Sequence, residues 1–356
     1  MKIVVTGSQF PDSFTRNIFV TLESMGHEVT AVATSHSYHH QNRIQRVFWA
    51  YASLAFPRIE RAAFVNLIRT VAEIQPDMVL LTYGLPPEIL RQLREVSGAK
   101  IACWFTDAIS NFNRGYLVAG SYDALFIKEP YLIPLLRDKL ELNAFYLPEA
   151  CNPQWHKPTV LTEEDRREYG TELAAIGTFH YYRARMLEPF TGYGLKIWGA
   201  SCPPWIDSPA RASYQNQFVG EHTKAKALRA AKIVINTMYY TEIDGLNCSL
   251  FEIAGCGAFQ IADWKPSLPE LFEPEREIVT FRSRAELREK VEYYLQKPEE
   301  RSAIAERACR RAHRDHTYQK RLETILTMVL PGQMDAPSET ILAYRSMPTR
   351  ESDSKD

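Results

Sequence analysis

The residues of this sequence best suited to chemistry lie in one stretch, residues 230–274, which combines acidic residues, glycine and the start of a helix. After an apolar run, a polar loop carries Asp244 and Gly245, and a helix is expected to begin near Asn247. The first turn of a helix presents backbone N–H groups and positive dipole, so this helix start is a natural seat for a diphosphate. Glu252, one turn into the helix, is placed to accept hydrogen bonds from two ribose hydroxyls.

The same stretch also has a purely structural interpretation. Strand–loop–helix units that end in glycine occur in any α/β domain, and most of them bind nothing. In that interpretation Asp244 caps the helix and Glu252 is a solvated helix carboxylate. Spacing alone leaves these alternatives open.

Short apolar runs that alternate with helical patterns surround this stretch along most of the chain. In the first half, strands are expected at residues 2–6, 28–33, 77–83, 100–105, 124–128 and 144–147. In the second half, they are expected at residues 173–177, 196–199, 233–236, 258–262 and 278–281. Strands that alternate with helices indicate parallel pairing with right-handed crossovers. The fold class predicted is therefore α/β, with two Rossmann-like doubly wound domains that face each other across a cleft.

The domain boundaries follow from shifts in composition. Residues 1–158 form the expected N-terminal domain, with a helical insertion at about 36–75 that is divided at Pro57. Residues 159–330 form the expected C-terminal domain, and its last helix, 318–330, is expected to leave that domain and pack on the first. Residues 331–356 read as a flexible tail.

Composition excludes several classes of protein. The 356 residues include 42 Lys and Arg against 43 Asp and Glu. The chain therefore lacks the basic excess that is typical of proteins that bind nucleic acid. The six cysteines form no C-x-x-C pair and no zinc-ligand cluster, and no D-x-D motif stands in a suitable place. The sequence shows no signal peptide and no run long enough to span a membrane, so a cytoplasmic location is expected.

Two sequence patterns carry a family resemblance. Asp244 and Glu252 form a D-x7-E pattern that resembles the E-x7-E donor motif of GT-B glycosyltransferases. More narrowly, the chain is similar to the CgeB-like (spore-maturation-type) glycosyltransferases in NCSLFEIAGCGAFQIAD, in LPELFEPEREIVTF and in the closing helices. WFTD at 104–107, YDALFI at 122–127 and YLPEACNPQWHKP at 146–158 extend this likeness into the first half.

The resemblance implies a nucleotide-diphosphate sugar as donor, held by the C-terminal domain, and an unidentified acceptor held by the N-terminal domain. It implies no metal ion and no cofactor, because protein cations and helix N–H groups neutralise the leaving diphosphate. Asp244, Gly245, Leu246 and Asn247 would line the sugar and the diphosphate through side chains and backbone amides, and Glu252 would hold the ribose.

Further site residues follow from the same resemblance. The family has a glycine after the first strand of this domain and an arginine six residues later, which are Gly177 and Arg183 here. Arg183 could clamp the diphosphate with two hydrogen bonds, whereas Arg185 fits a surface position nearly as well. His180 and Tyr182 are weaker candidates beside it.

Asp107 and Glu149 each follow an expected strand and are the candidates for the base that deprotonates the acceptor. Asp107 could equally orient the acceptor or cap the next segment.

Two other functions remain open at this point. A nucleotide-sugar epimerase can share the two-domain fold and would need only the donor. A catalytically degenerate module would bind a nucleotide sugar or a partner protein without turnover, and Asp244 in place of glutamate keeps that alternative open. The closing helices are expected to present a solvated face rather than to contact an anionic membrane surface.

Overall fold

The computed structural model describes residues 1–33, 56, 61–62, 64–107 and 115–330 of the chain. The helix pair expected on either side of Pro57 falls largely outside these residues, and so does the tail from residue 331. The chain divides into two compact units, one made of residues 1–147 and 322–356 and the other of residues 148–321. Each unit is described by itself below.

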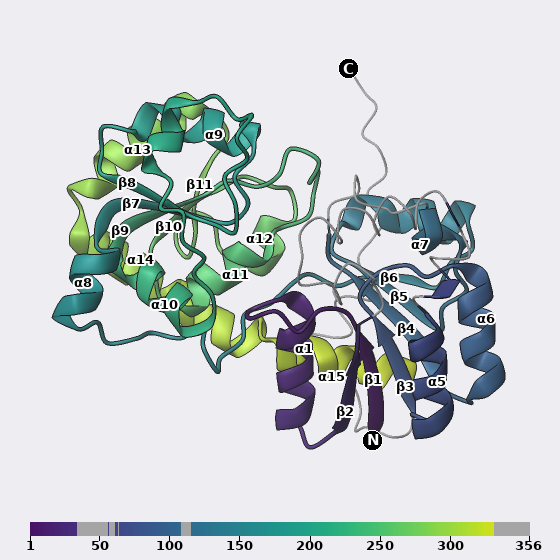
Figure 1. Cartoon of the computed structure of the whole chain (residues 1–356). Helices are drawn as coiled ribbons and strands as arrows, with labels where there is room; N and C mark the ends of the chain where they lie inside the picture. The colour runs from purple at the N-terminus through teal and green to yellow at the C-terminus, as the bar shows by residue number, and fades with distance from the viewer. Residues whose placement is uncertain (34–55, 57–60, 63, 108–114, 331–356) are drawn as a thin grey trace. The chain divides into compact units, whose positions relative to one another are not determined.

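A six-stranded sheet forms the centre of the first unit, and every pair of neighbouring strands in it is parallel (Figure 1). Its strands are β1 (Lys2–Thr6), β2 (Glu28–Val32), β3 (Met78–Leu81), β4 (Lys100–Phe105), β5 (Ala124–Ile127) and β6 (Ala144–Tyr146). They lie in the order β2-β1-β3-β4-β5-β6. The continuous apolar runs of β3 and β5 are buried along their whole length, as expected of strands that are covered on both faces.

Helices connect these strands as right-handed crossovers require. They are α1 (Phe14–Ser24), α5 (Val65–Ile74), α6 (Pro87–Val96) and α7 (Tyr116–Ala119), with short turns η3 (Pro130–Leu132) and η4 (Leu135–Lys139). Ser13 caps α1, because its side chain accepts a hydrogen bond from the Arg16 N–H. The apolar sides of α5 and α6 pack on the sheet in one core.

The second unit is built on a five-stranded parallel sheet. Its strands are β7 (Thr171–Ile176), β8 (Leu195–Trp198), β9 (Ala231–Asn236), β10 (Gln260–Asp263) and β11 (Val279–Phe281). They lie in the order β11-β10-β9-β7-β8. Residues of β7 alternate between two cores, since Leu173 and Ala175 pack in one and Ala174 in the other, so both faces of this sheet are covered.

Seven helices and two short turns surround this sheet among the described residues. They are α8 (Glu163–Tyr169), α9 (Tyr181–Leu187), η5 (Glu188–Phe190), η6 (Pro209–Ser213), α10 (Glu221–Ala230), α11 (Cys248–Gly255), α12 (Leu268–Leu271), α13 (Arg284–Leu295) and α14 (Pro298–Asp315). Helices α9 and α13 contribute to the core that holds Leu173, whereas α10 and α11 contribute to the core on the opposite face.

The units divide at residues 147 and 148, earlier than the boundary at 158 that the sequence indicates. The segment after Leu147 joins the second unit because its backbone pairs with residues near the end of α14. The Cys151 N–H donates to the His316 carbonyl (2.9 Å), and the Tyr318 N–H donates to the Cys151 carbonyl (3.0 Å). The chain returns to the first unit within α15 (Tyr318–Val329), whose residues from Leu322 onward belong there, as expected.

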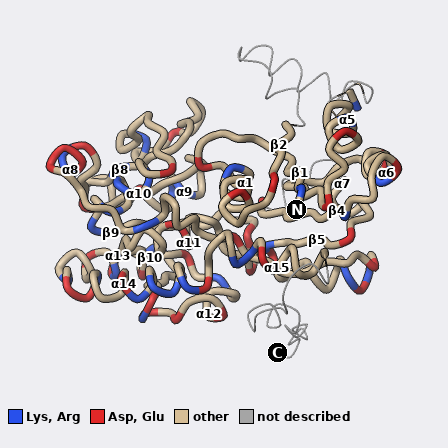
Figure 2. The backbone as a smooth tube through the Cα atoms, turned by 90° about the horizontal axis from the view of Figure 1, so that it is seen from below, with Lys and Arg blue, Asp and Glu red and all other residues tan. Residues whose placement is uncertain are grey.

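Charges of both signs alternate along the backbone of each unit (Figure 2), in keeping with the net charge of -1. Among the described residues, every helix is too short or too polar to cross a bilayer.

Candidate functional site

The helix start that the sequence singled out lies at the carboxyl edge of the second sheet. Asn247 is the N-cap of α11, because its side-chain oxygen accepts the Leu250 N–H (3.1 Å). Asn236, at the end of β9, donates to that same oxygen (3.2 Å) and accepts a hydrogen bond from the Asn247 amide (3.0 Å). Gln260 ties β10 to the helix by donating to the Leu250 carbonyl (2.9 Å). The first turn of α11 is therefore held rigidly at the sheet edge.

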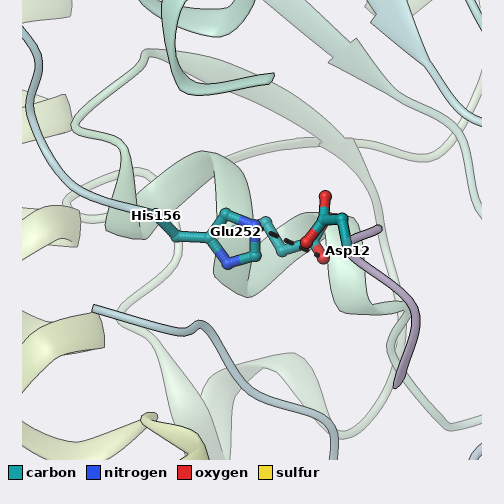
Figure 3. Close-up of side chains that lie close together, drawn as sticks. All are labelled: Asp12, His156 and Glu252. Atoms are coloured by element: carbon teal, nitrogen blue, oxygen red, sulfur yellow. Dashed lines mark ion pairs between the residues drawn. The ribbon is translucent and has the colours of Figure 1, made fainter. Parts of the chain in front are cut away.

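Glu252 is buried on α11, where it pairs with Lys224 and lies near His156 of the same unit. The Lys224 Nζ of α10 lies 2.9 Å from Glu252 Oε2. His156 Nε2 lies 3.9 Å from Glu252 Oε1 (Figure 3). His156 Nδ1 accepts the Asn152 N–H (3.0 Å), which fixes the orientation of the ring. Asp12, also drawn in that figure, belongs to the first unit. With 4% of its surface exposed, Glu252 is not the solvated helix carboxylate of the structural interpretation.

The residues of the loop before α11 differ in which of their atoms can meet a ligand. Leu246 is fully buried in the core with Leu250, so only its backbone can meet a ligand. The Asn247 side chain is occupied by the cap, so Asn247 too can meet a ligand only through its backbone. Asp244 is partly exposed, and its carbonyl accepts a hydrogen bond from Ser267. Since Asn247 is the N-cap of α11, Asp244 does not cap this helix.

Gly177 and Arg183 meet directly after β7. Gly177 has φ +119°, and a Cβ at this position would lie 2.7 Å from Arg183 Nη1, so only glycine fits here. The Arg183 guanidinium donates to the Thr178 carbonyl (2.7 Å), to Thr237 Oγ1 (3.0 Å) and to the Thr237 carbonyl (3.2 Å). Arg183 thus joins the loop after β7 to the loop after β9.

Burial lowers the pKa of Arg183 but leaves the group charged at neutral pH. Desolvation lowers the pKa of its guanidinium to about 10, and the carboxylate of Glu242 acts in the opposite direction. The group therefore stays positive at neutral pH and leaves a buried cation at the sheet edge. Arg185, by contrast, is exposed and pairs with Glu188 at 3.4 Å, which fits the surface position that the sequence analysis offered for it.

The two candidate bases belong to different units. Asp107 is exposed and follows β4 in the first unit. Glu149 belongs to the second unit and is buried, and its carbonyl accepts a hydrogen bond from Arg321 (3.4 Å). Their role as a base stays a prediction for both.

Lys224 and His156 are site residues that the sequence analysis did not identify. His156 stands inside the quoted segment YLPEACNPQWHKP, and Lys224 lies on a helix with no motif of its own. No spacing rule links either residue to Glu252, because the chain brings them together only in the folded unit.

Comparison with known proteins gives one family match and a set of similar structures. Residues 183–327 match the family model described as glycosyl transferase-like. The second unit contains a glycosyltransferase-like domain. No curated protein matches the chain in sequence.

Solved structures of GT-B glycosyltransferases share the fold. One is sucrose-phosphate synthase from Thermosynechococcus elongatus, with TM-score 0.64 and 13% identity over 91% of this chain and 97% of that one. A glycosyltransferase from Rickettsia africae has TM-score 0.63 and 12% identity over 93% and 99% of the two chains. Anabaena HepE in complex with UDP-glucose has TM-score 0.63 and 10% identity over 92% and 100%. The predicted GT-B fold class is confirmed, whereas the narrower CgeB-like resemblance stays a prediction.

Proposed function

We propose that this protein is a glycosyltransferase that moves a sugar from a nucleotide-diphosphate sugar to an acceptor. The observation that carries the proposal is the glycosyl transferase-like match over residues 183–327, which includes Asp244 and Glu252 in the D-x7-E pattern. Relatives in fold have been solved with UDP and with UDP-glucose, which supports a nucleotide sugar as the donor.

The proposed donor site comprises the start of α11, the loop before it and the turn after β7. The N–H groups of the first turn of α11 and the Arg183 cation would neutralise the diphosphate. Glu252 would accept hydrogen bonds from the ribose hydroxyls while Lys224 holds its other oxygen. These groups supply positive charge from the protein itself, and we propose that transfer proceeds without a metal ion.

Titration of the protein with nucleoside diphosphates and their sugars, with and without magnesium, tests this proposal. A native-state ligand raises the thermal midpoint by mass action, so one nucleotide should raise it without metal. Release of nucleoside diphosphate that depends on an added acceptor would distinguish a transferase from an epimerase and from a binding module. A folded protein that no nucleotide stabilises would contradict the proposal.

Glu252→Gln tests the ribose contact within the same experiment. The substitution keeps the volume of the side chain but removes the charge that strengthens its hydrogen bonds, so we expect nucleotide affinity to fall about tenfold or more. Glu292→Gln, on the exposed face of α13, is the matched control and should bind as the wild type does. Unchanged affinity in Glu252→Gln, with an unchanged circular dichroism spectrum, would remove Glu252 from the site.

A further inference from the structure

Four aromatic side chains gather at the carboxyl edge of the second sheet, and we call them the aromatic patch: His180, Tyr182, Tyr239 and Tyr240. His180 and Tyr182 stand at the start of α9, and the two other tyrosines follow β9. Ring centroids lie 4.4 Å apart for Tyr239 and Tyr240, 4.9 Å for His180 and Tyr239, and 6.4 Å for Tyr182 and Tyr240. Ligands of open parallel sheets bind at this edge.

The aromatic patch presents ring surface to solvent. Tyr240 is 63% exposed, and the other three side chains are half-buried. Tyr293 on α13 is a useful contrast, because its hydroxyl lies 3.1 Å from a Glu300 oxygen and the Lys297 ammonium lies 5.4 Å from the centre of its ring. Tyr293 also meets the ring of Tyr294 edge-on, with centroids 5.0 Å apart. Its charged neighbours are nevertheless typical of a solvated helix surface, whereas Tyr240 makes tilted ring contacts with Tyr239 and Tyr182.

Two polar groups border the rings of the aromatic patch. The Tyr182 hydroxyl donates to Asp263 Oδ2 (2.9 Å) at the end of β10. Burial raises the pKa of the Asp263 carboxyl, and the hydrogen bond from Tyr182 opposes that effect. The Tyr239 hydroxyl donates to the Tyr240 hydroxyl (3.2 Å), so acceptor oxygens and hydroxyl groups line the border of the rings.

His180 adds a hydrogen-bond donor in a defined tautomer. Its Nδ1 accepts the Arg183 N–H as the N-cap of α9 (3.3 Å). Burial, with a smaller effect of Arg183, lowers the pKa of the imidazole to about 4, so the ring is neutral at pH 7. A neutral ring that accepts at Nδ1 carries its hydrogen on Nε2, which is therefore a donor.

We infer that the aromatic patch is a binding site for a pyranose ring. Such a ring has an apolar face of C–H groups that suits the electron-rich faces of tyrosines, and a border of hydroxyls that both donate and accept. Asp263 and His180 Nε2–H supply one acceptor and one donor for those hydroxyls. This inference rests on the proposed function and extends it, because it assigns the recognition of a sugar to residues outside the D-x7-E pattern.

The loop from β9 to α11 connects the aromatic patch to the proposed donor site. Tyr239 and Tyr240 lie at its start, and Asp244 and Gly245 at its end. A pyranose on the patch comes from one of two sources, the sugar of the donor or a sugar of the acceptor. Calorimetric titration distinguishes them with three probes: a nucleoside diphosphate, its hexose derivative and a free disaccharide such as maltose or cellobiose.

The variants for this titration are Tyr240→Ala, Tyr240→Phe and the control Tyr293→Ala. Loss of one ring of the patch should weaken binding about tenfold in Tyr240→Ala, and Tyr240→Phe should keep most of the affinity because the ring face is kept. Tyr240 is exposed, so the variants should fold as the wild type does. Tyr293→Ala should bind every probe as the wild type does.

Each outcome of the titration decides a separate point. Weaker binding of the hexose derivative alone, with the nucleoside diphosphate unaffected, assigns the patch to the donor sugar. Weaker binding of the free disaccharide assigns it to the acceptor. Equal affinity of Tyr240→Ala and wild type for all three probes overturns the inference and leaves the proposed function intact. An equal loss of affinity for the nucleoside diphosphate and for its hexose derivative also overturns the inference, because the ring of Tyr240 then stacks on the base. If no nucleotide binds the wild type, the proposed function fails and the inference fails with it.

Discussion

The ion pair between Lys224 and Glu252 offers the sharpest test of how the second unit is built. Their atoms lie 2.9 Å apart, and the two residues are 8% and 4% exposed, so water cannot replace a missing partner. Removal of one partner from a buried ion pair costs about 3–5 kcal/mol, because the other charge stays buried without compensation. We therefore expect Lys224→Met to lower the free energy of unfolding by about 3 kcal/mol.

Urea-induced unfolding followed by circular dichroism measures this loss, with the m value used to detect separate transitions of the two units. Arg288→Met is the matched control, because Arg288 and Glu292 lie 3.0 Å apart but are largely exposed. An exposed pair contributes about 1 kcal/mol or less, so this control should remain close to the wild type.

The double variant Lys224→Met/Glu252→Met completes the test. Replacement of a buried pair by apolar side chains is often neutral, so the double variant should recover most of the stability that the single variant loses. The reasoning would be refuted if Lys224→Met cost less than about 1 kcal/mol, or if the double variant lost the sum of both single effects. Even with its stability restored, the double variant should bind nucleotides more weakly than the wild type, since Glu252 is absent.

Two further perturbations test other parts of the second unit. Burial, with the Arg321 guanidinium, lowers the pKa of His316 to about 3, so the unfolded chain binds a proton between pH 6.5 and 3 that the folded chain does not. Stability should therefore fall as the pH falls through that window, by about 2.7 kcal/mol at pH 4.5. Acid titration of the wild type against His316→Gln should show this difference, and parallel curves would contradict it. Gly177→Ala should lower stability by about 2 kcal/mol and weaken nucleotide binding, because the new Cβ displaces Arg183. Gly192→Ala is the control, because a Cβ there meets open space, and it should change neither property in the same urea and titration assays.

The strands could be predicted closely because each combines a buried apolar run with a clear end. Residues 100–105 were expected and found as β4 with both ends correct. The expected strand 77–83 ends early, at Leu81, because Thr82 leaves the ladder and donates instead to the Thr6 carbonyl (2.8 Å). The expected strand 258–262 begins late, at Gln260, because the Ala258 N–H is still bonded to the Ile253 carbonyl at the end of α11. Such side-chain and helix-end bonds override local propensity at element ends.

The candidate site could be predicted only where its residues are close in sequence. Glu252 and the cap at Asn247 lie within one loop and helix, so a pattern identified them. The partners of Glu252 come from α10 and from the segment before α8, and only the folded sheet brings them together. Hydrophobic periodicity predicts which face of a helix is buried, but it does not predict which polar side chain will share that burial.

The hydrogen bonds of Arg183 bear on the diphosphate contact that we propose for it. A guanidinium has five N–H groups, and three of them bond to Thr178 and Thr237. Among the described residues, these bonds leave two N–H groups for a ligand. Since both loops hold the guanidinium, a diphosphate that reaches those two groups meets a cation already oriented and desolvated, and it need not order a flexible side chain. The bonds that make Arg183 look structural are thus the same bonds that would make it an effective anion ligand.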